Sequence, residues 1–216
     1  MIRLSALLLG GLLLLGAGSA WPMQFTVQYN GGNCGQCAWL LADGVIAPGT
    51  TAALRRFVAG AGELPKLVRF NSPGGDPTEA MRLGRYLRAA GFDTIVAEDT
   101  ALLPGQLFAF AKQPASCFDA CVYAFLGGVR RVAAEDHLGF GGPMRNEIAG
   151  DAAAADRLRR TLADYVLEMG VDPRLVAASA GPGLYLFRRA ELIALRIDNT
   201  QAWHEESAGR GRSAPS

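Results

Sequence analysis

The stretch LVRFNSPGGDP, residues 67 to 77, decides the fold of this 216-residue chain. Residues 67 to 70 are typical of a short buried strand, and the turn from Asn71 to Pro77 leads into a helix that stops at Gly91. Residues 93 to 97 predict the next strand. A strand, a crossover helix and a second strand imply parallel pairing, and a parallel sheet needs both faces covered. The sequence therefore predicts an α/β fold with a mostly parallel sheet.

Hydrophobic periodicity and turn residues predict the other elements. Residues 102 to 114 are ambiguous, and we expect a loop with at most a short helical turn. The remaining expected elements, in chain order, are a strand at 25–29, an extended hairpin at 38–46 that turns at Asp43-Gly44, a helix capped by Thr50 or Thr51 and running to Gly60, a helix at 120–126, a strand at 131–134, a glycine-rich turn at 138–143, a helix at 151–169, a helix started by Pro173, and a short helix and strand at 191–197.

Residues 1–20 are typical of a cleaved secretory signal peptide. Arg3 supplies the positive start, Leu4 to Leu15 is a mostly apolar run, and Gly18 to Ala20 supplies the small residues that a signal peptidase needs. The alternative is an uncleaved anchor, but a spanning helix needs about 20 apolar residues and this run is shorter. We therefore expect a periplasmic or secreted protein with no membrane contact after cleavage.

The mature part of the chain is long enough for one domain with its own core, which we place at residues 21–201. Residues 202–216 have the Gly, Ser and Pro content of a disordered tail. The 21 Lys and Arg residues nearly balance the 20 Asp and Glu residues, and no run of like charge is long enough to follow a phosphate backbone. Nucleic acid is therefore not an expected partner.

The four cysteines form two close pairs, Cys34 with Cys37 and Cys117 with Cys121. An even count in an exported chain favours disulfides. The pairing stays open, because a local bridge between Cys117 and Cys121 and a bridge to the Cys34 segment both fit a helix start. A structural zinc ion held by thiolates is the alternative, which an oxidising compartment disfavours. We expect disulfides and no metal.

Gly74 and Gly75 end a strand and precede a helix, which is what a backbone oxyanion site requires. Glycines let the chain bend so that an N–H faces a bound carbonyl oxygen, and the helix start adds positive partial charge. An ordinary strand-to-helix turn is the alternative for such a loop taken alone.

Four parts of the chain, in this order, carry a resemblance to a known family: residues 70–75, 117–121 with 124–128, 138–143 and 190–198. In these segments the chain resembles the Clp-protease and crotonase superfamily, and most closely its exported bacterial Clp-like proteins with cysteines around the nucleophile. The resemblance implies a ββα superhelix, and it allows assembly into trimers or hexameric rings.

The resemblance implies that the oxyanion donors are the N–H groups of Gly75 and Ala120. It places the family's nucleophilic serine at Asp119 and its histidine base at Gly141. The acid of the triad would lie before the closing helix, but Ser179 to Phe187 contains no carboxylate. All three catalytic positions are therefore altered.

Acyl transfer by serine needs a hydroxyl whose proton an oriented base can take, and Asp119 has no such hydroxyl. A carboxylate at this helix start would accept hydrogen bonds from the oxyanion donors and plug the site, or act as an N-cap. Other polar residues are weak candidates to replace the missing nucleophile or base. We expect the Ser72 hydroxyl to hydrogen-bond within its own turn, Ser116 to point away from the site, and the His137 ring to be hydrogen-bonded in a structural role. Nothing in the sequence places the other candidate bases beside a nucleophile: His204, Lys66 and Lys112.

Three functions follow from these observations. The first is a catalytically inactive or strongly divergent Clp-like protein, a pseudoenzyme, that binds a peptide or protein partner and needs no cofactor. The second is a divergent hydrolase that uses Asp119 with the Gly75 and Ala120 donors. The third is a thiol-disulfide oxidoreductase at Cys34 and Cys37, although the predicted hairpin after Cys37 lacks the long helix that such a redox pair opens.

Overall fold

The computed structural model describes residues 21–29, 38–98, 100–103, 106–109, 114–141, 151–181 and 183–200. The strands are β1 (Gln24–Tyr29), β2 (Ala38–Asp43), β3 (Leu67–Asn71), β4 (Asp93–Val96), β5 (Thr100–Leu103), β6 (Gln106–Ala109), β7 (Cys117–Phe118), β8 (Arg131–Ala133), β9 (Leu138–Phe140) and β10 (Tyr185–Leu186). The helices are α1 (Thr50–Gly60), α2 (Pro77–Ala89), α3 (Ala120–Leu126), α5 (Ala152–Glu168), α6 (Leu175–Ala180) and α7 (Arg189–Ala194).

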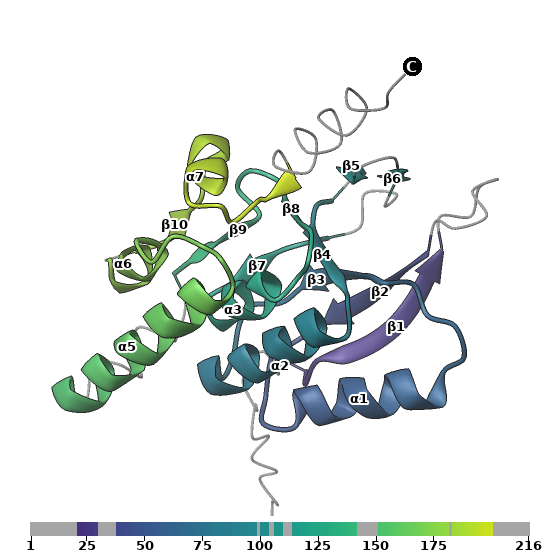
Figure 1. The fold of residues 1–216 in the computed structure, drawn as a ribbon, viewed down its shortest axis with the longest axis horizontal. Coiled ribbons are helices and arrows are strands. Elements are labelled where there is room, and N and C mark those ends of the chain that lie inside the picture. The colour runs from purple at the N-terminus through teal and green to yellow at the C-terminus, as the bar shows by residue number, and fades with distance from the viewer. Residues whose placement is uncertain are drawn as a thin grey trace, which may run out of the picture.

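The predicted α/β class with a mostly parallel sheet is confirmed. The main sheet has the order β1-β2-β3-β4-β8, in which only the β1–β2 pair is antiparallel. A second sheet has the order β10-β9-β7, and an isolated bridge between Ser72 and Cys117 joins its β7 side to the end of β3. Figure 1 shows α1 and α2 side by side below the main sheet, and α5, α6 and α7 at the opposite end of the molecule.

Both faces of the main sheet are buried, as a parallel sheet requires. On β2 and β3, Leu40 and Val68 face the main core with the helices, whereas Trp39 and Leu67 face a smaller cluster on the other side. This alternation follows the two-residue period of a strand. The sheet therefore positions the end of β3, where the glycine turn begins, on a rigid base.

Helix α3 lies in the centre of the core, and all seven of its residues are buried. Its close contact with α2 depends on two glycines: a methyl group on Gly127 would lie 2.2 Å from the carbonyl oxygen of Gly84, and one on Gly84 would lie 3.0 Å from the carbonyl oxygen of Tyr123 in α3 and 1.9 Å from the Tyr165 hydroxyl of α5. Distances this short are far inside van der Waals contact, so only glycine fits at either position.

Two arginines, the half-buried Arg88 and the buried Arg131, donate hydrogen bonds to the C-terminal end of α3. Arg88 donates to the carbonyl oxygens of Leu126 and Gly128, and Arg131 donates to the same two oxygens. Burial lowers the pKa of Arg131 to about 10, and repulsion from Arg88 adds to this shift. These contacts satisfy carbonyl groups that a helix end leaves unpaired.

Two local predictions at the N-terminal side are wrong. The chain does not fold back at Asp43-Gly44, because Gly44 donates its N–H to the carbonyl of Asn71 and β2 instead pairs with β1 and β3. The first helix is not capped by a threonine: its N-cap is Gly49, and the Thr50 hydroxyl donates to the carbonyl of Ala47 outside the helix.

In three further segments the observed short strands differ from the predicted ones. Residues 100–103 and 106–109 form the antiparallel β5–β6 hairpin in the range expected to be a loop. Residues 138–140 form a strand, β9, because they pair with β7 and β10. The strand expected near Ile197 is absent, and this part of the described chain contains only α7 and turns.

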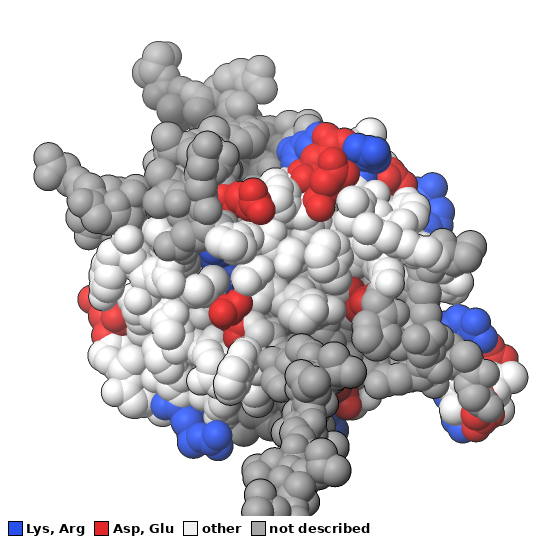
Figure 2. Space-filling view, turned by 180° about the vertical axis from the view of Figure 1, so that it is seen from behind, with Lys and Arg blue, Asp and Glu red and all other residues white. Residues whose placement is uncertain are grey.

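Charged groups are dispersed on the face of the molecule shown in Figure 2, where acidic and basic side chains alternate between larger uncharged areas. Among the helices of the described residues, none combines the length and the apolar character that a membrane span requires. Residues 1–20 and the tail at 202–216 lie outside the described residues, as do Cys34, Cys37, Lys112 and His204.

Candidate functional site

The turn after β3 is fixed by two backbone hydrogen bonds to Ile46. Ile46 donates to the carbonyl of Gly74 at 2.8 Å, and Asp76 donates to the carbonyl of Ile46 at 2.8 Å. Gly74 and Gly75 have φ angles of 116° and 136°, which favour glycine. A methyl group on Gly75 would lie 2.0 Å from the carbonyl oxygen of Ile46, so no side chain fits there.

This turn lies beside the start of α3. Phe118 donates its N–H to the carbonyl of Ser72 at 3.0 Å, which brings the two segments together. A methyl group on Gly74 would lie 3.0 Å from Cβ of Asp119 and 3.4 Å from the N–H nitrogen of Ala120. The structure thus places Gly74 next to the two residues that the sequence resemblance assigned to the nucleophile and to an oxyanion donor.

The N–H groups of Gly75 and Ala120 are available as donors. The hydrogen bonds found in the described part of the chain include none from either group. Ala120 is the first residue of α3, where a helix leaves its N–H groups unpaired and positive partial charge gathers.

Asp119 turns its side chain into the protein. It is 2% exposed, has a φ of 50°, and accepts the N–H of Gly141 on Oδ1 at 2.9 Å. Its Oδ2 is buried and has no hydrogen-bond partner among the described residues. The carboxylate therefore ties together the two positions where the resemblance expects a nucleophile and a base. The predicted plug is wrong, because among the described residues the carboxylate accepts no hydrogen bond from Gly75 or Ala120. The alternative is also not fulfilled: Asp119 occupies the N-cap position of α3, but its side chain makes no capping hydrogen bond.

Gly141 leaves no room for a side chain. A methyl group there would lie 2.7 Å from Cδ1 and 2.8 Å from Cα of Leu184, just before β10. Two residues earlier, a methyl group on Gly139 would lie 2.1 Å from the carbonyl oxygen of Tyr185 in β10. Leu184, next to β10, therefore occupies the volume that a histidine at residue 141 would need.

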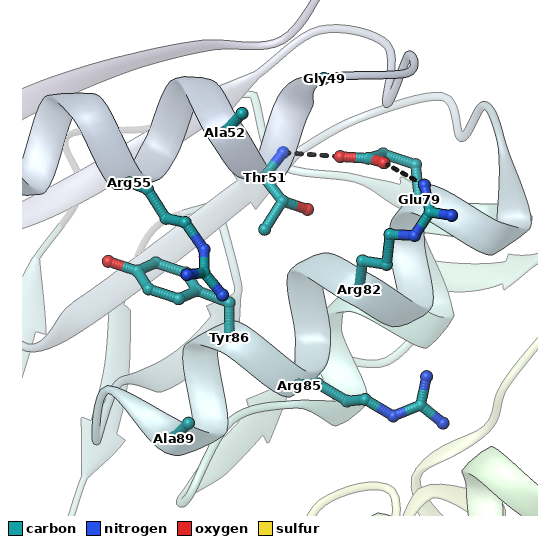
Figure 3. A pocket seen from close by; sticks show the side chains of 9 residues that line it. All are labelled: Gly49, Thr51, Ala52, Arg55, Glu79, Arg82, Arg85, Tyr86 and Ala89. Carbon is teal, nitrogen blue, oxygen red and sulfur yellow. Dashed lines mark hydrogen bonds and ion pairs between the residues drawn. The ribbon is translucent and has the colours of Figure 1, made fainter.

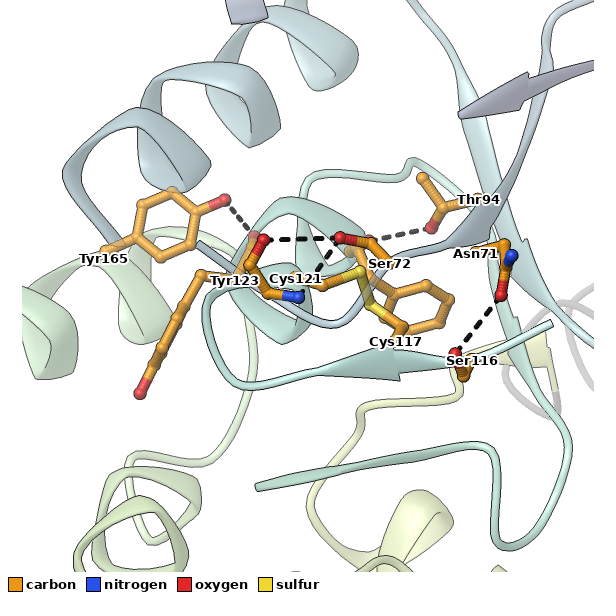
Figure 4. Close-up of a disulfide and its surroundings, with 10 residues drawn as sticks. Asn71, Ser72, Thr94, Ser116, Cys117, Cys121, Tyr123 and Tyr165 are labelled. Atoms are coloured by element: carbon orange, nitrogen blue, oxygen red, sulfur yellow. Dashed lines mark hydrogen bonds between the residues drawn. A yellow bond between two sulfur atoms is a disulfide. The ribbon is translucent and has the colours of Figure 1, made fainter. Parts of the chain in front are cut away.

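The hydroxyl groups of Tyr123 and Ser179 are buried in this part of the protein, and their polar residue types are the only sign of them in the sequence. Burial raises the pKa of Tyr123 well above its usual value; the neighbouring Ser179 side chain opposes this shift, and the nearby Asp119 carboxylate adds to it. Ser179 donates to the carbonyl of Val176 at 2.7 Å. The Tyr123 backbone carbonyl accepts the Tyr165 hydroxyl at 2.7 Å (Figure 4). The surroundings of Asp119 therefore contain polar groups, but these groups are buried and do not face solvent.

The substitute nucleophiles and bases are engaged elsewhere. Ser72 exchanges hydrogen bonds with Gly74 of its own turn, as expected. Ser116 donates to Oδ1 of Asn71 at 3.2 Å, and His137 donates from Nδ1 to the carbonyl of Ala115 at 2.8 Å. Lys66 donates to the carbonyl of Ala90. Within the described residues, none of these pairs a hydroxyl with a base.

Cys117 and Cys121 form a disulfide across the first turn of α3, with Cα atoms 5.1 Å apart (Figure 4). Of the two arrangements left open above, the local bridge is therefore the one formed. Both sulfur atoms are committed to this bond, so they cannot serve as thiolate ligands of zinc. The disulfide fixes the helix start on either side of Asp119.

The arrangement offers two backbone donors and one buried carboxylate. Among the described residues it lacks an oriented base beside a hydroxyl, which a serine mechanism needs. In the part of the chain that the structure describes, no group of three or more His, Cys, Asp or Glu residues is placed to hold a metal ion.

No protein-family model matches this chain, and no curated protein matches it. Among solved structures, it is similar to ClpP1 from Listeria monocytogenes at 11% identity and a TM-score of 0.49, covering 74% of this chain and 88% of that chain. It is also similar to a putative enoyl-CoA hydratase from Streptomyces avermitilis at 11% identity and a TM-score of 0.47, covering 92% of this chain and 76% of that one. A putative enoyl-CoA hydratase from Streptomyces coelicolor A3(2) shares 16% identity with a TM-score of 0.38, covering 84% and 69%. At these identities the likeness concerns the fold alone.

Proposed function

We propose that this protein is an exported Clp-like scaffold of the bacterial periplasm that has no serine-peptidase activity and binds a peptide or protein segment. The observation that carries the proposal is the Asp119 carboxylate, which stands at the nucleophile position and accepts the N–H of Gly141. A serine mechanism needs a hydroxyl there and a base at or near residue 141. A carboxylate held by a backbone N–H supplies neither.

The closure of residue 141 supports the same proposal. Since Leu184 lies within 2.8 Å of where a side chain would begin, the site excludes a histidine sterically as well as by sequence. The free N–H groups of Gly75 and Ala120 remain suited to holding a backbone carbonyl of a bound segment, because neither donates to another described group. Binding without turnover is what such a site supports.

The catalytic half of the proposal is tested with a fluorophosphonate probe and fluorescent casein on the purified mature protein. We expect no labelling and no cleavage above buffer, with an active serine hydrolase as positive control. Labelling that disappears in Ser72→Ala or Ser116→Ala would overturn the proposal. Asp119→Ser is expected to stay unlabelled because it has no base beside it, and adding Gly141→His is expected to change nothing, because Leu184 blocks the added ring.

The binding half is tested by fluorescence anisotropy with labelled peptides derived from casein. The proposal requires saturable binding to the folded protein and no binding to the thermally unfolded chain. Absence of saturable binding over a broad peptide set contradicts it.

A divergent hydrolase that uses Asp119 is the second candidate, favoured by the unpartnered Oδ2 atom. A carboxylate can form a covalent intermediate with a bound carbonyl group. If ester or peptide turnover is detected, Asp119→Asn separates the two functions: loss of turnover with an unchanged melting temperature supports the hydrolase.

Export is tested by N-terminal sequencing of the protein recovered from the periplasm. We expect the mature chain to begin at or near Trp21. The Trp21 carbonyl accepts the N–H of Val45 at 2.8 Å, a bond that cleavage after Ala20 preserves. An intact N-terminus in the membrane fraction would instead indicate an uncleaved anchor.

A further inference from the structure

A hollow of about 660 Å³ lies between α1 and α2, separate from the start of α3 (Figure 3). Its volume falls within the range of about 300 to 1,000 Å³ that is usual for ligand pockets. Helix α1 contributes Ala52 and Arg55, and helix α2 contributes Arg82 and Ala89. The floor between the charged groups is lined by small side chains.

The lining carries an excess of positive charge. Three arginines line it, Arg55 on α1 with Arg82 and Arg85 on α2, against a single acidic residue, Glu79. Arg85 is partly neutralised from outside the hollow, because it forms an ion pair with Glu168. Arg55 and Arg82 are the two guanidinium groups left to face a ligand.

Both of these guanidinium groups have donors to spare. Arg55 lies over the ring of Tyr86 at 4.7 Å, which orients it without using its N–H groups. Arg82 makes one contact, from Nη1 to Glu79 at 3.3 Å, and its side chain is 65% exposed. No other acceptor for either guanidinium is found within the described residues. Guanidinium groups match the geometry of carboxylates.

Glu79 already shows how this hollow holds a carboxylate. It is 4% exposed, and its Oε1 accepts the N–H of Thr51 in the first turn of α1 at 2.8 Å while Oε2 faces Arg82. Burial alone would raise the pKa of Glu79, but the hydrogen bonds from Thr51 and Arg82 lower it further than burial raises it. A carboxylate is therefore stable in its ionised form at this end of the hollow.

In Figure 3 the arginines are spread along the two helices and do not converge on one point. A single phosphate or sulfate needs converging donors, whereas spaced donors with small apolar residues between them suit an extended chain. We propose that the α1–α2 hollow binds an acidic peptide segment, whose carboxylates pair with Arg55 and Arg82 and whose intervening side chains lie over Ala52 and Ala89. This inference rests on the proposed peptide-binding function and gives it a place and a charge preference.

Fluorescence anisotropy with two labelled peptides tests the inference. One peptide alternates Glu with Ala and Leu, and the matched peptide carries Gln in place of each Glu. We expect the acidic peptide to bind about tenfold more tightly at low salt, with the preference shrinking as salt is added. The double variant Arg55→Gln/Arg82→Gln is expected to bind both peptides equally. The control Arg157→Gln/Arg159→Gln, which removes the same charge from exposed positions on α5, is expected to keep the preference.

Several outcomes overturn the inference. Equal binding of the two peptides by the wild type does so, and so does a preference that survives Arg55→Gln/Arg82→Gln; either result leaves the proposed peptide-binding function standing. Competition by inorganic phosphate alone at the concentration of the acidic peptide also overturns it, since it indicates a converging anion site. If neither peptide nor any casein-derived peptide binds, both proposals fall together.

Discussion

The start of α3 and the α1–α2 hollow differ in whether their polar side chains are hydrogen-bonded within the fold. Around α3, polar side chains are consumed by the fold: Thr94 donates to the carbonyl of Phe125, Tyr165 to that of Tyr123, and Asp119 accepts from Gly141. In the hollow, by contrast, Arg55 and Arg82 keep donors facing solvent. The polar side chains in the region where the resemblance expects a catalytic centre are held by hydrogen bonds within the fold, whereas the arginines with spare donors lie on two helices that carry no recognisable motif.

If this contrast is correct, changes at α3 should mainly lower stability, and changes in the hollow should mainly alter binding. The following predictions test the contrast in order of decreasing effect.

Gly127→Ala should lower the free energy of unfolding by about 3 kcal/mol, because the added methyl would overlap the backbone of Gly84. Gly60→Ala is the matched control: no atom lies within 4 Å of the added methyl, so this substitution at the end of α1 should be neutral or stabilising by up to about 1 kcal/mol. Urea unfolding followed by circular dichroism measures both. Equal effects would contradict the close packing of α2 on α3.

Replacing Cys117 and Cys121 together by Ala should cost about 2 kcal/mol, because the bridge closes a very short loop and long loops gain more. Both cysteines are buried, so dithiothreitol should reduce this bond in unfolded protein much faster than in native protein. Alkylation followed by peptide mass spectrometry reports the two sites separately from the other cysteines. Rapid reduction of the native bridge would show that the start of α3 opens readily.

Asp119→Ala should cost about 1 to 2 kcal/mol, since it removes the acceptor for Gly141 and leaves alanine at a positive φ. Asp119→Asn should cost less than about 0.5 kcal/mol, because asparagine keeps an oxygen acceptor and tolerates this backbone conformation. Thermal melts at neutral pH measure the difference. Equal losses would mean that the negative charge, and not the hydrogen bond, stabilises the turn.

Glu79→Gln should have the smallest effect of the four changes, and the effect should appear in the pH dependence of the free energy of unfolding. The pKa of Glu79 is lowered below 4.5 in the folded protein. Its stabilising contribution is therefore complete above the pKa of the unfolded chain and is lost as the pH falls through the folded pKa. The stability advantage of the wild type over Glu79→Gln should shrink between pH 6 and pH 3. Glu63→Gln, at an exposed position, is the control.

The sequence predicts the central part of the fold well because its signals there are local. The strand at 67–70, the glycine turn and the following helix each carry their own residue pattern, and the helix at 120–126 has the expected bounds. The strands β7, β9 and β10 were not predicted, because two or three residues are too few to show the alternation of apolar and polar side chains that is typical of a strand. They become strands only through pairing with distant segments. The predicted hairpin at Asp43-Gly44 is wrong because β2 pairs with β3 there, and this pairing outweighs the local turn signal.

For the candidate site, the structure brings together residues that the sequence resemblance named, and their roles remain predictions. Gly74, Ala120, Asp119 and Gly141 lie in one place, although they span nearly 70 positions of the chain (roughly half a typical domain). The resemblance could not predict that Leu184 closes residue 141, because that contact depends on the path of the backbone. The sequence also did not indicate the hollow. Arg55 and Arg82 look like ordinary surface residues of two amphipathic helices, and only the packing of α1 beside α2 brings them to one hollow.

The contacts of Leu184 and Tyr185 with Gly141 and Gly139 also limit which substitutions this chain accepts. A side chain at residue 141 requires a shift at Leu184, and one at residue 139 requires a shift at Tyr185. A histidine added at residue 141 alone clashes, so placing a base there takes at least two coordinated changes. A single substitution at this position therefore does not bring an imidazole beside Asp119.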